Sequence, residues 1–334
     1  MNKLTGGISK NSFKSYLSKI VGDQRIVLIF VLIAFSAVVT IINPRFLTVN
    51  NLVLIFQQIS IVGVLTMAMS ILMLAGNVDL SIGNIMVLSG CVMAKLIEGN
   101  PKAGIEGIGV GSAVAIGLAT GIICGAINGI LVAKSKCVSL VITLGLSGAY
   151  YGLSLIITQG RVMSFTRHFE PIRQLRIGGL IPITLIAFLI LVVITFFLIN
   201  NTKFGRRIVA LGGNEENARL CGIKVDRCKI ITFTISGLYC AIAAIIYASR
   251  LDAISASSGT GYETSALTGA IIGGITFDGG RGTISGAFLG AFFMGVLSNA
   301  MNVLAVDNFV QTVISGLVIV AAVIISNIEQ IRQK

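Results

Sequence analysis

The sequence predicts an all-α, polytopic membrane protein with about ten transmembrane helices. Three observations support this fold class: 55% of the 334 residues are hydrophobic, only 11% are charged, and the mean hydropathy is +0.95. A soluble domain of this size cannot bury so much apolar surface, because its interior volume is limited. The apolar residues also gather in runs of about 20, the length of a helix that crosses a bilayer. No change of composition separates domains, so residues 1–334 are expected to form a single transmembrane domain.

Ten apolar runs define the expected spans in chain order. They cover residues 26–42, 52–75, 82–98, 106–133, 137–158, 180–200, 230–250, 265–278, 283–305 and 309–327. The first run leads into NPRF without a cleavage site of small residues, so it is expected to be a retained helix rather than a signal peptide. The third run begins just after the polar NVDLS stretch, and the eighth, SALTGAIIGGITF, is short. Both are expected to be half-helices or strongly bent helices.

The positions of Lys and Arg set the expected orientation, because cytoplasmic loops are enriched in these residues. With the N-terminus inside, the cytoplasmic segments hold 17 of the 25 basic residues. These segments are 1–25, 134–136, 201–229, 279–282 and 328–334. Both termini are therefore expected in the cytoplasm. Because the net charge of +12 is spread over short loops between apolar spans, a nucleic-acid partner is not expected, and membrane lipid surrounds the chain.

An inverted repeat is possible in this topology. Spans 2–5 and spans 7–10 would form its halves, and the second half runs in the opposite sense to the first. The third elements of the two halves open on similar triplets, Asp79-Leu80-Ser81 and Glu263-Thr264-Ser265.

Glycines recur at four-residue spacing in two of the expected spans. The rows are Gly117, Gly121, Gly125 and Gly129 in the fourth span, and Gly282, Gly286 and Gly290 at the ninth. Faces of small residues let helix backbones approach closely. Tight packing within one subunit is the expected role, and a subunit interface is the alternative.

Motifs for cofactor or metal chemistry are missing from the sequence. There is no GxxxxGK[ST] loop for ATP phosphates, and the six cysteines lack CxxC spacing. The single histidine, His168, lies in a polar loop. The chain is therefore expected to bind no metal or cofactor itself and not to be an enzyme.

Polar residues in or near the spans are candidates for lining a solute path. They are Asn77, Asp79, Ser81, Asn84, Asn128, Thr143, Asn299 and Asn302. Neutral hydrogen-bonding groups suit an uncharged, hydroxyl-rich solute, because each can donate or accept. Only a minority is expected to touch a solute, since such residues commonly bond to neighbouring helices. The middles of the spans are almost free of ionisable groups, which argues against an ion-coupled secondary carrier, the alternative from another class.

Two polar segments outside the spans suggest partners. The expected external loop 159–179 carries Arg161, Arg167, Arg173 and Arg176 against a single glutamate. This loop is either a docking patch for an acidic partner or a solvated loop.

The second segment, LGGNEENARLCGIKVDRCKI at 211–230, lies on the expected cytoplasmic side. A short amphipathic helix ending at Gly222 is expected there, with the glycine as its C-terminal stop. This helix either inserts into a groove of a soluble partner or belongs to a solvated connector.

The sequence resembles a known family at these positions. The spacing E-N-A-x-x-x-G at 216–222 is similar to the E-A-A-x-x-x-G loop of bacterial ABC importer permeases. AGNVDLSIGNIMVLSG (75–90), TKFGRRIVALGGNEENARLCGIKV (202–225) and the segment 261–306 resemble signature segments of the ribose/galactose/xylose-type, or monosaccharide, branch. The similarity covers essentially the whole chain in the same order. Asn217 replaces the middle alanine of the loop motif, and the trailing proline of many such loops is absent.

The resemblance implies the permease subunit of an ATP-driven sugar importer in the bacterial plasma (inner) membrane. It implies three partners: a cytoplasmic ABC ATPase that binds ATP and Mg, an extracytoplasmic sugar-binding protein, and a second permease copy or close relative. A nucleoside, autoinducer or polyol is the alternative solute within the same family.

The resemblance also suggests roles for particular residues. Within the cytoplasmic segment 201–229, the ATPase-coupling loop would contain Gly212, Gly213, Asn214, Glu215, Glu216, Ala218, Arg219 and Gly222. The four external arginines would dock the binding protein. The translocation path would include Asn77, Asp79, Ser81, Asn128, Thr143 and Asn299.

Overall fold

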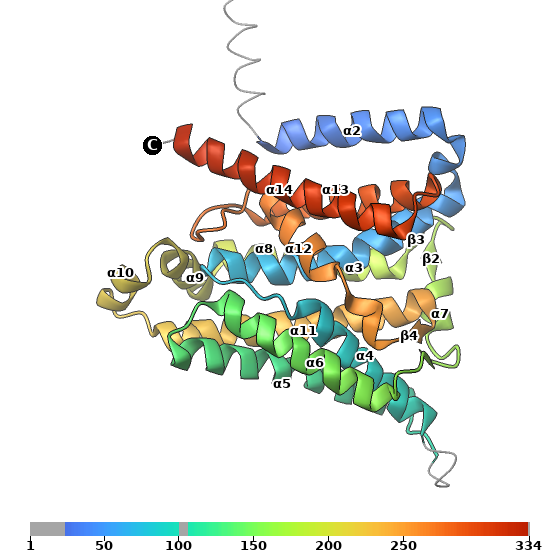
Figure 1. The fold of residues 1–334 in the computed structure, drawn as a ribbon, viewed down its shortest axis with the longest axis horizontal. Helices are drawn as coiled ribbons and strands as arrows, with labels where there is room; N and C mark the ends of the chain where they lie inside the picture. The colour runs from blue at the N-terminus through green and yellow to red at the C-terminus, as the bar shows by residue number, and fades with distance from the viewer. Residues whose placement is uncertain (1–23, 100–105, 333–334) are drawn as a thin grey trace, which may run out of the picture.

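The computed structural model describes residues 24–99 and 106–332, which form a bundle of helices (Figure 1). Each of the ten expected spans coincides with a helix. These helices are α2 (Gln24–Ile42), α3 (Val49–Leu74), α4 (Ile82–Glu98), α5 (Val110–Ser135), α6 (Ser139–Thr158), α8 (Ile183–Asn201), α11 (Val225–Leu251), α12 (Tyr262–Ile272), α13 (Ile284–Val303) and α14 (Asn308–Arg332). Nearly all of the expected cytoplasmic segment 1–25 lies outside the described residues. The all-α fold class is confirmed.

The helices differ in length and in how well their composition suits a membrane span. Seven of them have at least 18 residues and an apolar composition suited to crossing a membrane. By contrast, α12 has 11 residues and rises about 16 Å, about half of the ~30 Å hydrocarbon core. The eighth expected run is therefore a half-helix, as its length predicts.

Short elements mark the two ends of the bundle. The short helix η3 (Ala256–Gly259) is an exception and contacts α4 and α6. One end carries η1 (Pro44–Leu47), β1 (Met163–Ser164), α7 (Glu170–Gln174), β2 (Arg176–Ile177), β3 (Ile181–Pro182) and β4 (Ala253–Ile254), of which β1 pairs with β4 and β2 with β3, both antiparallel (Figure 1). We call it the α7 end. The opposite end, the α10 end, carries α9 (Lys203–Gly213) and α10 (Glu215–Leu220). The start of α2 and the end of α14 also lie at the α10 end (Figure 1).

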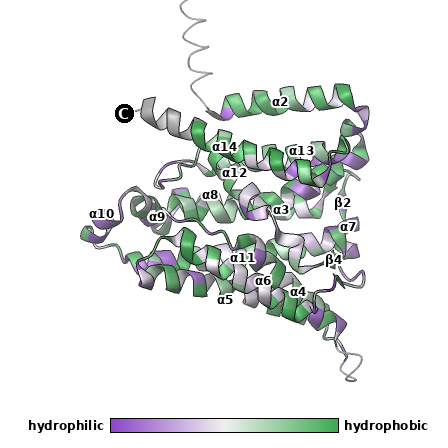
Figure 2. Cartoon of the chain, viewed as in Figure 1, coloured by the Kyte–Doolittle hydropathy of each residue, from purple (hydrophilic) through white to green (hydrophobic). Residues whose placement is uncertain are grey.

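Helix α3 lies at the centre of the bundle. Its residues are buried without a break from Gln57 to Leu74, and it contacts α8, α11, α12 and α13. A helix that is hydrophobic all round is buried on every side. Peripheral helices instead expose apolar side chains, such as Ile41 on α2 and Phe309 on α14. Figure 2 shows that the outer helix α2 consists mostly of hydrophobic residues, which matches a lipid environment.

The first glycine row brings α5 and α11 into backbone contact. A Cβ added to Gly129 would lie 2.7 Å from the Ile230 Cα, and one added to Gly125 would meet the Phe233 carbonyl oxygen. The expected close packing within one subunit is confirmed. In the second row, Gly286 and Gly290 pack on α12, but Gly282 does not belong to a helix face. It lies in the turn before α13 with φ of +126°, so the expected register was wrong at that position.

The half-helix α12 and the start of α4 meet inside the bundle. Each follows a long helix, α11 and α3 respectively, after an irregular segment. A Cβ added to Gly83 at the start of α4 would lie 2.6 Å from the Gly259 carbonyl oxygen and 2.7 Å from the Glu263 Oε2. This similar order of elements in the two halves fits an inverted repeat, which stays a prediction.

Candidate functional site

The expected short helix of the 211–230 segment is present as α10. Its N-cap is Asn214, whose side chain accepts a hydrogen bond from the Asn217 N–H at 2.8 Å. At the other end, the Ile223 N–H donates to the Ala218 carbonyl at 3.0 Å, while Gly222 adopts φ of +78°. This is the glycine-dependent helix stop that the sequence predicts. Among the residues of α10, Ala218 is buried and the rest face solvent.

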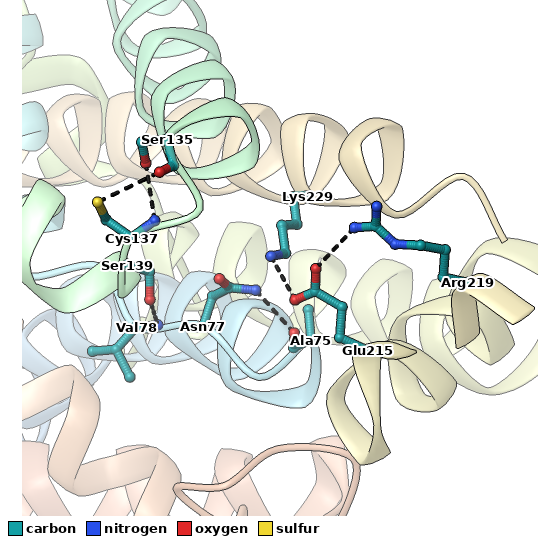
Figure 3. A network of polar contacts seen from close by, with 9 residues as sticks. All are labelled: Ala75, Asn77, Val78, Ser135, Cys137, Ser139, Glu215, Arg219 and Lys229. Carbon is teal, nitrogen blue, oxygen red and sulfur yellow. Dashed lines mark hydrogen bonds and ion pairs between the residues drawn. The ribbon is translucent and has the colours of Figure 1, made fainter. Parts of the chain in front are cut away.

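Glu215 ties α10 to the start of α11. Its carboxylate forms ion pairs with Lys229 at 2.7 Å and with Arg219 at 3.3 Å (Figure 3). The Lys229 side chain is only 13% exposed, so its pair is better shielded than that of Arg219, which is 60% exposed. A cleft of about 930 Å³ lies beside this pair, between α10, the α5–α6 turn and α11. Asn77 also lines the cleft and donates to the Ala75 carbonyl at 2.9 Å.

Glycines join three segments at this end, backbone to backbone. A Cβ added to Gly279 would lie 2.6 Å from the Gly76 Cα, and one added to Gly212 would meet the Leu74 carbonyl oxygen. The Gly280 N–H also donates to the Leu74 carbonyl at 3.1 Å. We call Gly76, Gly212, Gly279 and Gly280 the glycine junction. It connects the end of α3, the end of α9 and the turn between α12 and α13.

Three of the predicted path residues form a buried polar cluster. The Asp79 carboxylate accepts hydrogen bonds from the Ser81 N–H at 2.8 Å, the Ser81 hydroxyl at 2.5 Å and the Asn128 Nδ2 at 3.0 Å. The Asn128 Oδ1 in turn accepts from the Tyr150 hydroxyl at 2.7 Å. These bonds satisfy the buried carboxylate and fix the segment after α3 to α5 and α6.

The other predicted path residues have separate partners. Thr143 on α6 accepts the Leu80 N–H at 3.1 Å and so belongs beside the buried polar cluster. Asn299 on α13 instead exchanges two hydrogen bonds with Asn51 on α3, at 3.0 and 3.1 Å. The structure therefore brings Asp79, Ser81, Asn128 and Thr143 together and leaves Asn77 and Asn299 elsewhere. Of the two further candidates, Asn84 bonds to Ser147 and Asn302 to Gln311.

A pocket of about 490 Å³ lies between α3, α12, α13 and α14, and we call it the neutral pocket. Its polar lining consists of Gln58, Thr260, Tyr262, Thr264, Ser265, Ser298, Gln311, Thr312 and Ser315. Apolar side chains, such as Met294 and Leu297, complete the wall, and its described residues include no Asp, Glu, Lys or Arg. The Gln58 Nε2 donates to the Ser298 hydroxyl at 3.3 Å across the pocket wall. Neutral donors and acceptors on an apolar wall can bind and orient an uncharged polar ligand.

A second pocket of about 490 Å³ lies at the α7 end, and we call it the arginine pocket. It is lined by Asn50, Val53, Leu54, Gln57, Arg173, Gln174, Arg176, Arg250 and Leu251. Of the four predicted docking arginines, only Arg173 and Arg176 reach it. Arg161 pairs with Glu98 at 2.9 Å, and the Arg167 N–H donates to the Asp252 carboxylate.

Arg173 also pairs with Glu170 at 2.8 Å. Hydrogen bonds from the side chains of Arg173 and Gln174 lower the pKa of the Glu170 carboxyl below its usual value. No group of three His, Cys, Asp or Glu residues in the described parts of the chain is placed to hold a metal.

Residues 51–323 match the family described as the permease component of the branched-chain amino acid transport system. The ribose import permease of Bacillus subtilis is 34% identical over 290 residues, which cover 86% of this chain and 88% of the relative. In Escherichia coli, the D-allose transport system permease is 36% identical over 300 residues (88% and 89%) and the L-arabinose transport system permease is 33% identical over 325 residues (97% and 95%). No solved structure matches the chain.

The chain belongs to the ABC importer permease family. Its resemblance to the monosaccharide branch is confirmed by these relatives. The permease is a multi-pass protein of the inner membrane, and such subunits work with an ATPase and a substrate-binding protein in general.

Sequence reasoning missed the neutral pocket of this permease. Its polar residues are scattered over four apolar helices. In the sequence, each one is indistinguishable from a residue that only forms a hydrogen bond to a neighbouring helix. Two signals were available: the adjacent pair Gln57-Gln58 in an apolar run, and Gln311 with Ser315 one turn apart on α14.

Proposed function

We propose that this permease forms the path by which a monosaccharide crosses the inner membrane, and that the neutral pocket binds the sugar on its way. The lining of the neutral pocket is the main observation that supports this proposal. A sugar presents many hydroxyl groups and no charge, and a wall of amides and hydroxyls on an apolar background can satisfy them. The names of the relatives, which are ribose, D-allose and L-arabinose permeases, support a monosaccharide over other uncharged solutes.

The α10 end faces the cytoplasm in this proposal, where a separate ABC ATPase binds α10. Basic residues of the 201–229 segment support this orientation. Helix α10 presents Glu216, Arg219 and Leu220 to solvent, and the Leu220 side chain is 81% exposed. An exposed leucine between charged residues suits insertion into a groove of a partner. ATP and Mg bind to the ATPase and not to this chain.

The glycine junction carries the movement of α10 into the membrane. Because α9 touches the end of α3 and the α12–α13 turn through backbone atoms, no flexible side chain can absorb a displacement between them. A shift of α10 therefore moves α3, α12 and α13 together. Three walls of the neutral pocket belong to these helices, so the shift alters the pocket.

The α7 end faces outward and receives a binding protein loaded with sugar. Arg173 and Arg176 form the docking positions at the arginine pocket, and Arg161 and Arg167 flank them in the same loop.

A second permease copy, or a close relative, packs beside this chain, and the sugar passes between the two. The buried polar cluster around Asp79 holds the segment next to the cytoplasmic cleft, through which the path leaves.

Uptake in reconstituted vesicles tests the function. The permease is inserted with its ATPase, and labelled ribose, D-allose, L-arabinose, a nucleoside and a polyol are supplied in turn with the binding protein outside and ATP inside. One monosaccharide should accumulate only when ATP and both partners are present. Uptake that follows an ion gradient without either partner contradicts the proposal. Preferential uptake of the nucleoside or the polyol contradicts the assignment of a monosaccharide as the solute.

A pair of tyrosine variants tests the neutral pocket itself. Tyr262→Phe removes one hydroxyl from the pocket wall and should raise the sugar concentration needed for half-maximal uptake about tenfold, the scale of one hydrogen bond to a buried ligand. Tyr151→Phe, on the exposed side of α6, is the matched control and should leave uptake unchanged. Equal effects of the two variants contradict the assignment of the pocket.

A further inference from the structure

Gln57 and Gln58 are neighbours on α3, yet they line different pockets. Gln57 lines the arginine pocket, and Gln58 lines the neutral pocket. Arg250, another residue of the arginine pocket, donates a hydrogen bond from its Nη1 to the Gln58 Oε1. This one bond therefore crosses the wall between the two pockets.

Each end of the Gln58 amide has a hydrogen-bond partner in this arrangement. Its Oε1 accepts from Arg250 on α11, and its Nε2 donates to Ser298 on α13. Arg250 therefore takes one of the two lone pairs of this oxygen, which a sugar hydroxyl in the neutral pocket could otherwise use. As long as Arg250 stays in place, the pocket offers one hydrogen-bond acceptor fewer.

The arginine pocket has an excess of positive charge. Arg173 is paired with Glu170, but no ion pair joins Arg176 or Arg250 to a carboxylate in the described parts of the chain. The described residues that line the pocket also include no Asp or Glu. Guanidinium groups in such a setting bind a carboxylate in a bidentate ion pair, which is stronger than a hydrogen bond to a neutral amide.

The position of the pocket favours a protein carboxylate as its occupant. Its walls come from α7, β2 and the mostly buried helices α3 and α11, rather than from the lipid-facing helices α2 and α6. Leu54 and Leu251 line the pocket beside the arginines and are 46% and 49% exposed. Arginine next to exposed apolar side chains is typical of a protein interface.

We propose that Arg250 is a positioning residue that couples the two pockets. An Asp or Glu side chain of the docking extracytoplasmic protein enters the arginine pocket and draws the Arg250 guanidinium away from Gln58. The released Gln58 Oε1 then accepts a hydroxyl of the sugar, while its Nε2 keeps Ser298. The permease thus gains affinity for sugar at the moment when the loaded protein is seated. By reciprocity, sugar in the neutral pocket strengthens the docking. This inference rests on the proposed function.

Two measurements on the complex of permease and ATPase test the coupling. The first is the concentration of loaded binding protein that gives half-maximal uptake in vesicles. The second is the equilibrium binding of labelled sugar to the complex in lipid nanodiscs, without binding protein. Arg45→Gln serves as the control, because Arg45 lies at the same end and lines neither pocket.

The variants separate docking from coupling. Arg176→Gln should raise the half-maximal concentration about tenfold, by the loss of one charge pair, and leave sugar binding unchanged. Gln58→Leu should weaken sugar binding and lower the half-maximal concentration, because docking no longer has to break the bond between Arg250 and Gln58. Arg250→Gln should do two opposite things: weaken docking about tenfold, and strengthen sugar binding, because Gln58 is permanently released. The double variant Arg250→Gln with Gln58→Leu should lose that gain, and Arg250→Lys should restore values near those of the native protein.

Three results overturn the inference. One is an Arg250→Gln variant whose sugar binding is unchanged or weakened, since Arg250 then only docks or only supports the fold. Another is docking that is insensitive to Arg176 and Arg250. The third is a half-maximal concentration that follows the anionic lipid content through Arg176, which assigns the pocket to a lipid phosphate. Failure of the proposed function looks different: the native complex would then show no uptake that depends on the binding protein. The uptake measurement alone reveals this result.

Discussion

At the α10 end of the permease, the segments touch backbone to backbone through Gly76, Gly212 and Gly279, whereas at the α7 end exposed ion pairs are added to the backbone pairing of β1 with β4 and of β2 with β3. The ion pairs there, Arg161 with Glu98 and Arg173 with Glu170, have arginine side chains that are about half exposed. Exposed pairs contribute little stability and are screened by salt. Backbone contacts, by contrast, are rigid and insensitive to salt.

The difference suggests two kinds of task. Rigid contacts transmit displacement, because nothing between the segments can yield. Exposed charges can exchange one partner for another at low cost, as docking and release require. We therefore expect substitutions at the α10 end to act through shape and substitutions at the α7 end to act through charge.

The largest expected effect is at the glycine junction. Gly279→Ala should lower the free energy of unfolding by about 3 kcal/mol, because the new Cβ meets the Gly76 backbone and the residue must keep φ of +87°. Gly222→Ala is the matched control, since Gly222 also has a positive φ but open space around it. It should cost about 1 kcal/mol. Reversible unfolding in detergent micelles measures both, and equal losses contradict a close backbone contact.

An intermediate effect is expected in the buried polar cluster. Asn128→Leu removes a donor to Asp79 and the acceptor of Tyr150, and should cost about 2 kcal/mol through unsatisfied buried groups. Thr120→Val on the exposed side of the same helix should change stability little. The same unfolding measurement compares them. Were the Asn128 variant as stable as the control, the cluster would not hold the segment after α3.

The smallest effect belongs to the α7 end. The pKa of Glu170 is lowered in the folded protein, so its contribution to stability is present above the unfolded glutamate pKa of about 4.3 and is lost as the pH falls through the lower folded pKa. Glu170→Gln should therefore be slightly less stable than the native protein at neutral pH and equal to it in strong acid. Thermal unfolding at several pH values, in low and high salt, checks this. A difference that grows in acid has the wrong sign for this account.

The sequence predicts the helices well and the contacts between them poorly. The ten apolar runs, the half-helix α12 and the stop at Gly222 all follow from local periodicity, length and glycine conformation. The glycine junction does not, because Gly76, Gly212 and Gly279 stand in three separate segments without a common spacing, and Gly212 belongs to α9. The neutral pocket is equally hidden, since Gln58 and Gln311 come together only in the folded bundle.

The ratio of ATP hydrolysed to sugar imported tests most directly the claim that the glycine junction transmits the movement of α10. Gly212 and its neighbour Gly213 provide the comparison: a Cβ at Gly212 would meet Leu74 and Gly280, whereas one at Gly213 would meet nothing. In vesicles with ATPase and binding protein, the Gly212→Ala complex should still assemble and hydrolyse ATP but import little sugar. The Gly213→Ala complex should keep the native ratio. Equal ratios in the two variants would contradict the claim.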